Sequence, residues 1–243
     1  MVWNAVFAVL LFLSIIMVSP LLLKAKYLEW RGKVSAKDIY ADKVARGWSK
    51  AIIKLTGSKV EVIGAENIPE KSPVVFISNH QSYFDILVLL AYIPGQKGFI
   101  AKIETNKVPI FSAWMKQIHC IFMDRSNLRQ SFESIKEGIN NLQNGYRVVI
   151  FPEGTRSHNA EIADFKHGSF KLATKAGVPI IPVTIIGSYK IWEENNRIRP
   201  SQVKVIISKP IETSSLTRDE IRELPDKVHS IISGNLSAMK NNK

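Results

Sequence analysis

Hydrophobic positions are unevenly distributed along the chain, and the longest apolar run lies at its start. From Val2 to Leu23 there is no charged side chain, and only one asparagine, two serines and Pro20 interrupt the run. A helix of that length rises about 33 Å, which matches the hydrocarbon core of a bilayer, but the part before Pro20 spans only about 27 Å. The pattern therefore predicts a membrane-associated helix over residues 2–23, which either crosses the bilayer or lies in one leaflet. The alternatives are a buried core helix and a signal peptide, although no basic residues precede the run.

A basic segment follows the apolar run. Between Lys24 and Lys59 there are ten Lys or Arg residues and three acidic residues, so the positive-inside rule predicts that this flank faces the cytoplasm. Apolar residues at helical spacing predict an amphipathic helix over residues 38–55. Its stripe consists of Tyr40, Val44, Trp48, Ala51, Ile52 and Leu55. The stripe packs on the domain or lies in the lipid interface, and residues 1–57 together form a membrane-associated helical segment.

From Gly57 onward, short β-branched runs alternate with segments of helical periodicity. The predicted strands are Lys59–Ile63, Val74–Ser78, Gly98–Ala101, Ile121–Met123, Val148–Phe151, Ile180–Ile185 and Val203–Ser208. The predicted helices are Tyr83–Tyr92, Pro109–Gln117, Asn127–Gln143, Ser169–Ala176 and Thr217–Ser233. Such alternation is typical of an α/β fold. We therefore expect residues 58–243 to form a domain with a mostly parallel central sheet flanked by helices.

Composition and charge narrow the function classes. The 243 residues are 46% hydrophobic and 22% charged, which excludes a disordered or low-complexity chain. The formal net charge of +12 favours anionic partners such as phosphates, acidic lipids or nucleic acid. Many of the basic residues crowd the membrane flank and no nucleic-acid motif appears, so we expect membrane lipids rather than nucleic acid. Cys120 is the only cysteine, which excludes an internal disulfide and a thiolate-rich zinc site.

Three predicted strands end in clusters of polar residues. The strand ending at Ser78 is followed by NHQSYFD, the strand ending at Met123 by Asp124-Arg125, and the strand ending at Phe151 by PEGTR. In open α/β sheets, ligands bind beyond the carboxyl ends of the strands. The shared placement of these clusters therefore predicts a site at that edge of the sheet.

His80 and Asp85 form a candidate acid–base pair. His80 follows a strand and Asp85 falls in the first turn of the next helix, so the carboxylate can turn back and accept the imidazole Nδ1–H. That bond fixes the tautomer and leaves Nε2 as a base for a hydroxyl group. A histidine and an acid five residues apart also occur together by chance, so the pair alone does not establish catalysis.

The FPEGTR stretch is a candidate phosphate site. Gly154 allows close approach of a ligand to the backbone, Arg156 offers a planar fork for phosphate, and Glu153 can orient Arg156 or bind a substrate hydroxyl. A Glu–Arg pair that only ties down a loop is the structural alternative. Arg125 repeats the pattern beside Asp124, where an internal salt bridge competes with phosphate binding. Lys102, directly after a strand, is a further candidate cation.

Four sequence blocks, taken in order, resemble the glycerolipid acyltransferases, and most closely the bacterial lysophosphatidate acyltransferases. The blocks are His80-x4-Asp85, IFMDR at residues 121–125, FPEGTRS at residues 151–157, and IPV at residues 181–183. The resemblance covers roughly residues 59–210. One departure is that His119 and Cys120 stand where the family usually has a glycine ahead of the second block.

The resemblance implies a reaction and a role for each residue. His80, oriented by Asp85, would deprotonate the sn-2 hydroxyl of lysophosphatidate, and the alkoxide would attack an acyl thioester of acyl carrier protein or coenzyme A. Arg125, Arg156 and Lys102 would hold the acceptor phosphate, Glu153 would position the glycerol, and Gly154 and Thr155 would complete the binding loop. The family uses no metal, no cofactor and no acyl-enzyme, so Cys120 is expected to be a small buried hydrophobe.

Two alternatives to this function stay open. The same chemistry can act on glycerol 3-phosphate or another lysophospholipid, and the sequence does not separate these acceptors. A non-catalytic, membrane-tethered basic module would instead bind acidic lipid or nucleic acid with a steep salt dependence and no turnover. Hydrolase motifs such as G-x-S-x-G and H-E-x-x-H are absent from the sequence.

Overall fold

A computed structural model of the chain describes residues 2–241. Its N-terminal part is a chain of three helices: α1 (Val2–Val18), α2 (Leu21–Trp30) and α3 (Val34–Leu55). The sequence predicted a single helix over residues 2–23. The extent of that prediction is wrong, because Ser19 and Pro20 form a turn that separates α1 from α2. Proline cannot donate to the preceding turn, and Pro20 instead starts α2 at its N-cap. The apolar helical stretch from Trp3 to Trp30 is long enough to cross a membrane by length and composition.

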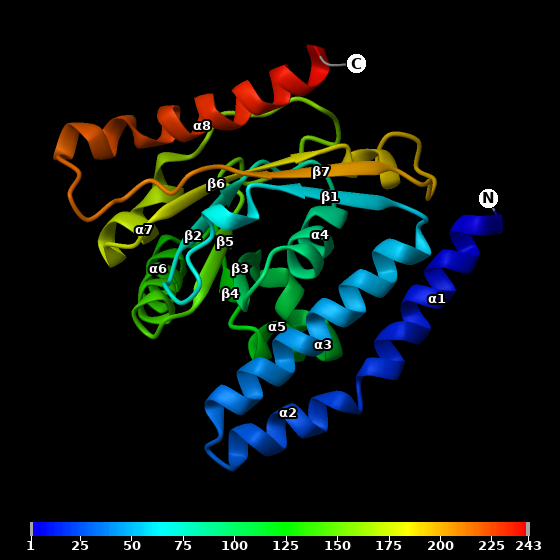
Figure 1. Cartoon of the computed structure of the whole chain (residues 1–243). Coiled ribbons are helices and arrows are strands. Elements are labelled where there is room, and N and C mark those ends of the chain that lie inside the picture. Colours follow the sequence, from blue (N-terminus) through cyan, green and yellow to red (C-terminus); the bar gives the residue numbers. More distant parts are fainter. Residues whose placement is uncertain (1, 242–243) are drawn as a thin grey trace.

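The amphipathic helix α3 begins four residues earlier than predicted and packs between α1 and the domain. Its Ile52 is buried, whereas Tyr40, Val44 and Trp48 are half-buried. Ala51, which the sequence assigned to the same stripe, is exposed. The Trp48 indole donates a hydrogen bond to the hydroxyl of Ser14 on α1 at 3.0 Å. The stripe thus packs largely on protein, and Figure 1 shows α1 and α2 lying outside α3.

Seven strands form the central sheet, in the order β1-β7-β6-β2-β5-β3-β4. They are β1 (Lys59–Ile63), β2 (Val75–Ser78), β3 (Lys97–Lys102), β4 (Ile121–Met123), β5 (Arg147–Ile150), β6 (Ile180–Ile186) and β7 (Gln202–Ile207). All neighbours pair in parallel except β6 and β7, which are antiparallel. The mostly parallel sheet that the alternating pattern predicted is confirmed.

Helices cover both faces of this sheet (Figure 1). On one face lie α3, α4 (Phe84–Tyr92) and α5 (Pro109–Gln117). On the other lie α6 (Leu128–Gln143), α7 (Lys171–Ala176) and α8 (Arg218–Asn241). The predicted helix at residues 169–176 begins as a short 3-10 turn, η3 (His167–Phe170), and the last helix runs further than predicted.

Strands β2, β5 and β6 form the centre of the molecule. The side chains of β2 and β5 are buried throughout, and those of β6 are buried apart from Ile186, as expected for parallel strands covered by helices on both faces. In register, Ile77 of β2 lies between Ile150 of β5 and Pro182 of β6. The carboxyl ends of β2 and β5 are thus adjacent, which brings the segment after Ser78 next to the segment after Ile150.

Candidate active site

The loop between β2 and α4 presents His80 and is fixed by an unusual set of hydrogen bonds. Five consecutive backbone N–H groups, from residue 80 to residue 84, each donate to a side-chain oxygen. The acceptors are Glu153 for His80, Asp85 for Gln81 and Ser82, Glu193 for Tyr83, and the Ser82 hydroxyl for Phe84. We call residues 80–85 the catalytic turn, because they contain the candidate acid–base pair His80 and Asp85. Three carboxylates therefore hold its backbone in one conformation.

His80 and Asp85 form the hydrogen bond that their spacing predicted. The His80 Nδ1 atom lies 2.8 Å from Asp85 Oδ2, and Asp85 is fully buried in the first turn of α4. The His80 ring stacks on Phe151, with ring centroids 3.9 Å apart. With Nδ1 engaged and one face covered, Nε2 is the nitrogen available to a substrate hydroxyl. The pair thus has the geometry of a general base oriented by a carboxylate.

Glu153 has a different position from the one that the sequence suggested. Its Oε1 accepts the backbone N–H of His80 at 2.6 Å, and its Oε2 accepts that of Ala163 at 3.0 Å. Glu153 is buried, and burial raises the pKa of its carboxyl group against the opposing effect of these two hydrogen bonds. Both carboxylate oxygens are therefore used inside the protein, where they brace the catalytic turn and the loop after β5. A contact between Glu153 and Arg156, one of the alternatives that the sequence offered, does not form; Arg156 pairs with another carboxylate.

Arg156 pairs with Glu193, a residue that the sequence analysis missed. The guanidinium carbon lies 3.4 Å from the centroid of the Tyr83 ring, and Nη1 lies 3.4 Å from Glu193 Oε1. Glu193 follows η4 (Ser188–Ile191), a 3-10 turn at the carboxyl end of β6. Polar residues after a strand end were the signal that identified the other loops, and the run Glu193-Glu194-Asn195 gives the same signal beyond η4.

The remaining predicted cations lie around the loop after β5. Arg125 is exposed and donates a hydrogen bond to the backbone carbonyl of Gly154, whose φ of 76° is the left-handed conformation that favours glycine. Lys102 ends β3 and is exposed. Asp124 Oδ1 accepts hydrogen bonds from the backbone N–H and the hydroxyl of Ser126. Among residues 2–241, the Asp124–Arg125 salt bridge considered from the sequence does not form.

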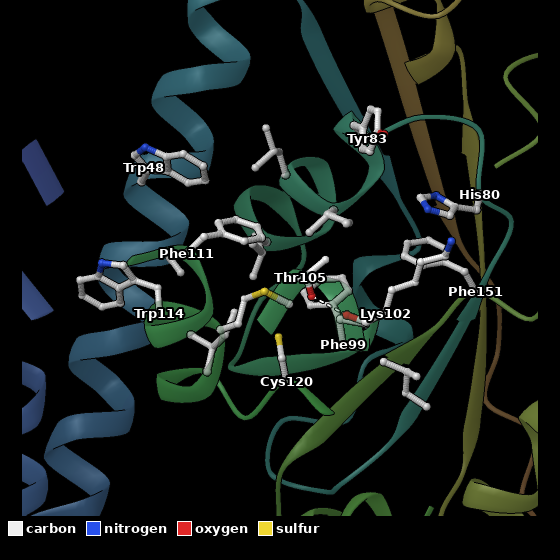
Figure 2. Close-up of a pocket in the computed structure, with 18 of the residues that line it drawn as sticks. Trp48, His80, Tyr83, Phe99, Lys102, Thr105, Phe111, Trp114, Cys120 and Phe151 are labelled. Atoms are coloured by element: carbon white, nitrogen blue, oxygen red, sulfur yellow. Dashed lines mark hydrogen bonds between the residues drawn. The ribbon is translucent and has the colours of Figure 1, made fainter. Parts of the chain in front are cut away.

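An apolar cavity of about 550 Å³ opens beside His80. It lies between α1, α3, α4, β3 and α5, and residues such as Ile15, Trp48, Leu87, Phe99 and Trp114 line it. Figure 2 shows His80 and Phe151 at one end of the cavity and Trp48 and Trp114 at the other. Lys102, Arg125, Thr155 and Arg156 also border it. The cavity thus joins a basic, phosphate-compatible region to a deep apolar space.

Cys120 lies in the wall of this cavity and has the character of a buried hydrophobe. It is 4% exposed, and burial raises the pKa of its thiol to about 12, so the uncharged form predominates at neutral pH. Within residues 2–241, no three His, Cys, Asp or Glu side chains are grouped closely enough to hold a metal ion.

Residues 59–186 match the family model described as Acyltransferase. That segment is more than half of the chain and contains both the catalytic turn and the FPEGTR loop. The chain belongs to the acyltransferase family. This result confirms the resemblance that the four sequence blocks indicated. Glu193 of this acyltransferase lies beyond the matched segment.

Relatives and a solved structure resemble this acyltransferase over most of its length. It is 35% identical over 192 residues to a probable 1-acyl-sn-glycerol-3-phosphate acyltransferase of Mycoplasma pneumoniae. That match covers 74% of this chain and 71% of the relative. It is 34% identical to the human 1-acyl-sn-glycerol-3-phosphate acyltransferase alpha, over 82% of this chain and 71% of the relative. The crystal structure of the lysophosphatidate acyltransferase PlsC of Thermotoga maritima superimposes with a TM-score of 0.78 and 28% identity, over 96% and 95% of the two chains.

Proposed function

We propose that this acyltransferase moves a fatty acyl chain from an acyl thioester to the sn-2 hydroxyl of lysophosphatidate and so forms phosphatidate, a step of phospholipid biosynthesis. The observation that carries the proposal is the His80–Asp85 pair at the mouth of an apolar cavity, with basic side chains beside it. A general base serves the hydroxyl, the cavity suits an acyl chain, and the cations suit a phosphate. The relatives named for the same activity support the choice of acceptor.

His80 starts the reaction by taking the proton of the acceptor hydroxyl on Nε2. The oxygen attacks the thioester carbonyl, the tetrahedral intermediate collapses, and the carbon–sulfur bond breaks. The proton on His80 then passes to the departing thiolate, so the imidazole returns to its starting form. Asp85 stabilises the imidazolium that exists between these two proton transfers, because its buried carboxylate accepts the Nδ1–H throughout.

Cations hold the acceptor in place for that attack. Arg156, Arg125 and Lys102 border the cavity and bind the acceptor phosphate, since guanidinium groups match the geometry of phosphate oxygens. Gly154 and Thr155 form the loop that approaches the acceptor. Glu153 contributes through the backbone of His80, because it is buried away from the cavity lining and accepts the His80 N–H.

The cavity and the N-terminal helices define the environment of the substrates. Each buried methylene group of an acyl chain contributes about 0.8 kcal/mol to binding in such an apolar space. We assign the donor to acyl carrier protein or coenzyme A thioesters, with no cofactor or metal and no nucleic-acid partner. We place the enzyme on the cytoplasmic face of the inner membrane, because the basic flank from Lys24 to Lys59 follows the positive-inside rule.

The proposal is tested with purified protein in detergent, each of the two thioester classes, and a panel of acceptors. The acceptors are lysophosphatidate, glycerol 3-phosphate and lysophosphatidylcholine, with products identified by mass. We expect phosphatidate from lysophosphatidate, and we expect His80→Ala to lower kcat by about 10²–10⁴-fold, the usual contribution of a general base.

Three results would overturn the proposal. Near wild-type turnover by His80→Ala removes the assigned base. Preferential acylation of glycerol 3-phosphate or lysophosphatidylcholine changes the acceptor. Salt-sensitive lipid binding without any turnover supports the non-catalytic module instead.

A further inference from the structure

Glu193 joins two parts of the site that come from distant segments of the chain. Its Oε2 accepts a hydrogen bond from the Ser82 hydroxyl at 2.7 Å, and its Oε1 accepts one from the Tyr83 backbone N–H at 2.9 Å. The same Oε1 lies 3.4 Å from Nη1 of Arg156. The Glu193 side chain is only 3% exposed. A buried carboxylate is costly unless it is paired and hydrogen-bonded, and these three contacts meet that requirement.

Glu193 contacts both the catalytic turn and Arg156. The distance between these two parts of the site matters for the reaction. Ser82 and Tyr83 belong to the catalytic turn, whose N–H groups also bind Asp85, the partner of His80. Arg156 is held on one side by the carboxylate of Glu193 and on another by the face of the Tyr83 ring. Arg156 therefore takes its orientation from the catalytic turn, both directly and through Glu193.

We propose that Glu193 is a positioning residue that fixes the guanidinium of Arg156 relative to the catalytic turn. This inference rests on the proposed function, in which Arg156 binds the acceptor phosphate. A phosphate anchored at a set place brings the sn-2 hydroxyl to a set distance from His80 Nε2. Misplacement of a reacting group by about 1 Å can cost about 10²-fold in rate, so this orientation contributes directly to turnover.

The carboxylate of Glu193 also has an electrostatic effect on Arg156. Because of this effect, a variant that lacks the carboxylate is expected to have a distinctive change in kcat and KM. Glu193 offsets part of the positive charge of Arg156 at 3.4 Å, so its loss makes Arg156 a stronger but less well-directed anion site. Turnover is then expected to fall while the affinity for the acceptor phosphate stays or improves. A residue that binds substrate directly gives the opposite pattern, a higher KM with unchanged kcat.

The test compares Glu193→Gln with Glu194→Gln, which changes the exposed neighbouring carboxylate. We expect Glu193→Gln to lower kcat by about 10–100-fold, with an acceptor KM equal to or below that of wild type and an unchanged donor KM. Glu194→Gln is expected to match wild type in all three constants. A rise in acceptor KM at unchanged kcat, or wild-type kinetics for Glu193→Gln, overturns the inference.

A second pair of variants separates positioning from folding. Glu193→Asp keeps the buried charge but shortens the side chain, so we expect the fold to be retained, with a kcat below that of wild type. In an Arg156→Ala background, Glu193→Gln should have little further effect on kcat, because residues that act through one another are not additive. Full additivity of the two substitutions, or a wild-type kcat for Glu193→Asp, refutes the positioning role.

The same measurements distinguish this inference from the proposed function. If wild-type protein does not acylate lysophosphatidate, or if Arg156→Ala leaves the acceptor KM unchanged, the proposed acceptor site is wrong. If wild type is active and Arg156→Ala raises the acceptor KM while Glu193→Gln behaves as wild type, only the role of Glu193 is wrong.

Discussion

At the scale of single residues, the sequence predicted contacts that are local and missed those that depend on the fold. The spacing of His80 and Asp85 predicted their hydrogen bond, because a strand end and the first helical turn place five residues within reach of one another. Glu153 and Glu193 lie 73 and 110 residues from the N–H groups of His80 and Tyr83 that they accept. Those contacts arise only when the ends of β2, β5 and β6 lie side by side, and no spacing within one segment encodes them.

The bond from His80 N–H to Glu153 leads to a prediction for Glu153→Gln. A glutamine has one acceptor oxygen and one donor NH₂, so it leaves the backbone N–H of His80 or of Ala163 without an acceptor. An unsatisfied buried N–H costs about 1–3 kcal/mol. We expect the free energy of unfolding in urea to fall by that amount, and kcat to fall without a rise in acceptor KM.

The matched control is Glu161→Gln, which changes an exposed carboxylate of the same loop. It should leave both the stability and the kinetic constants unchanged. An acceptor KM that rises in Glu153→Gln at constant kcat would restore the role that the sequence suggested, in which Glu153 accepts a hydrogen bond directly from a hydroxyl group of the glycerol.

At the scale of elements, strands and most helices followed from hydrophobic periodicity, including β4 at Ile121–Met123, but the turn just before β4 did not. His119, in that turn, has a φ of 59°, the left-handed conformation that residues other than glycine rarely adopt. Its ring stacks on Tyr146 with centroids 3.7 Å apart, and its Nε2 lies 2.9 Å from Asp38 Oδ1 at the start of α3. Side-chain contacts to another element thus support a conformation that histidine adopts at a cost.

Asp38 is the centre of this connection, and its titration gives a pH-dependent prediction. Burial alone would raise its pKa, but hydrogen bonds from His119, Lys37 and Tyr146 hold the pKa of the carboxyl well below its usual range. Because the folded-state pKa is below that of the unfolded chain, this group stabilises the fold above about pH 4, and the contribution is lost as the pH falls further.

We therefore expect Asp38→Asn to be destabilised at neutral pH and less sensitive to acid than wild type. Removal of the charge leaves Lys37, which is 3% exposed, as a buried cation without its carboxylate, and such a loss costs about 3–5 kcal/mol. Urea unfolding in detergent at a series of pH values measures both effects. The exposed carboxylate of Asp226 provides the control, since Asp226→Asn should follow the wild-type pH curve. Equal acid sensitivity of Asp38→Asn and wild type would exclude this role for Asp38.

At the scale of the whole molecule, charge and apolar surface are concentrated in the N-terminal helices. The flank from Lys24 to Lys59 contributes seven of the net twelve positive charges, ten basic minus three acidic residues. Residues of α1 have two environments, because Leu11 and Ile15 line the cavity while Phe12 and Met17 are 63% and 78% exposed. The sequence predicted an apolar helix, but only the fold shows that one helix supplies both a cavity wall and an outer apolar surface.

An exposed apolar surface beside a basic flank is suited to anionic lipid, and its removal should separate membrane binding from catalysis. We expect wild-type protein to sediment with vesicles that contain anionic lipid more strongly than with neutral vesicles, and to be released by salt. Met17→Glu places a charge on the outer apolar surface and should reduce vesicle binding at least several-fold, because a buried charge opposes insertion. Turnover in detergent should stay near that of wild type, since Met17 points away from the cavity that Leu11 and Ile15 line.

Leu128 on α6 is 88% exposed, and Leu128→Glu is the matched control because it adds the same charge far from α1 in the sequence. If Leu128→Glu loses vesicle binding as strongly as Met17→Glu, the membrane surface extends beyond the N-terminal helices; if Met17→Glu binds vesicles as wild type does, the surface lies elsewhere.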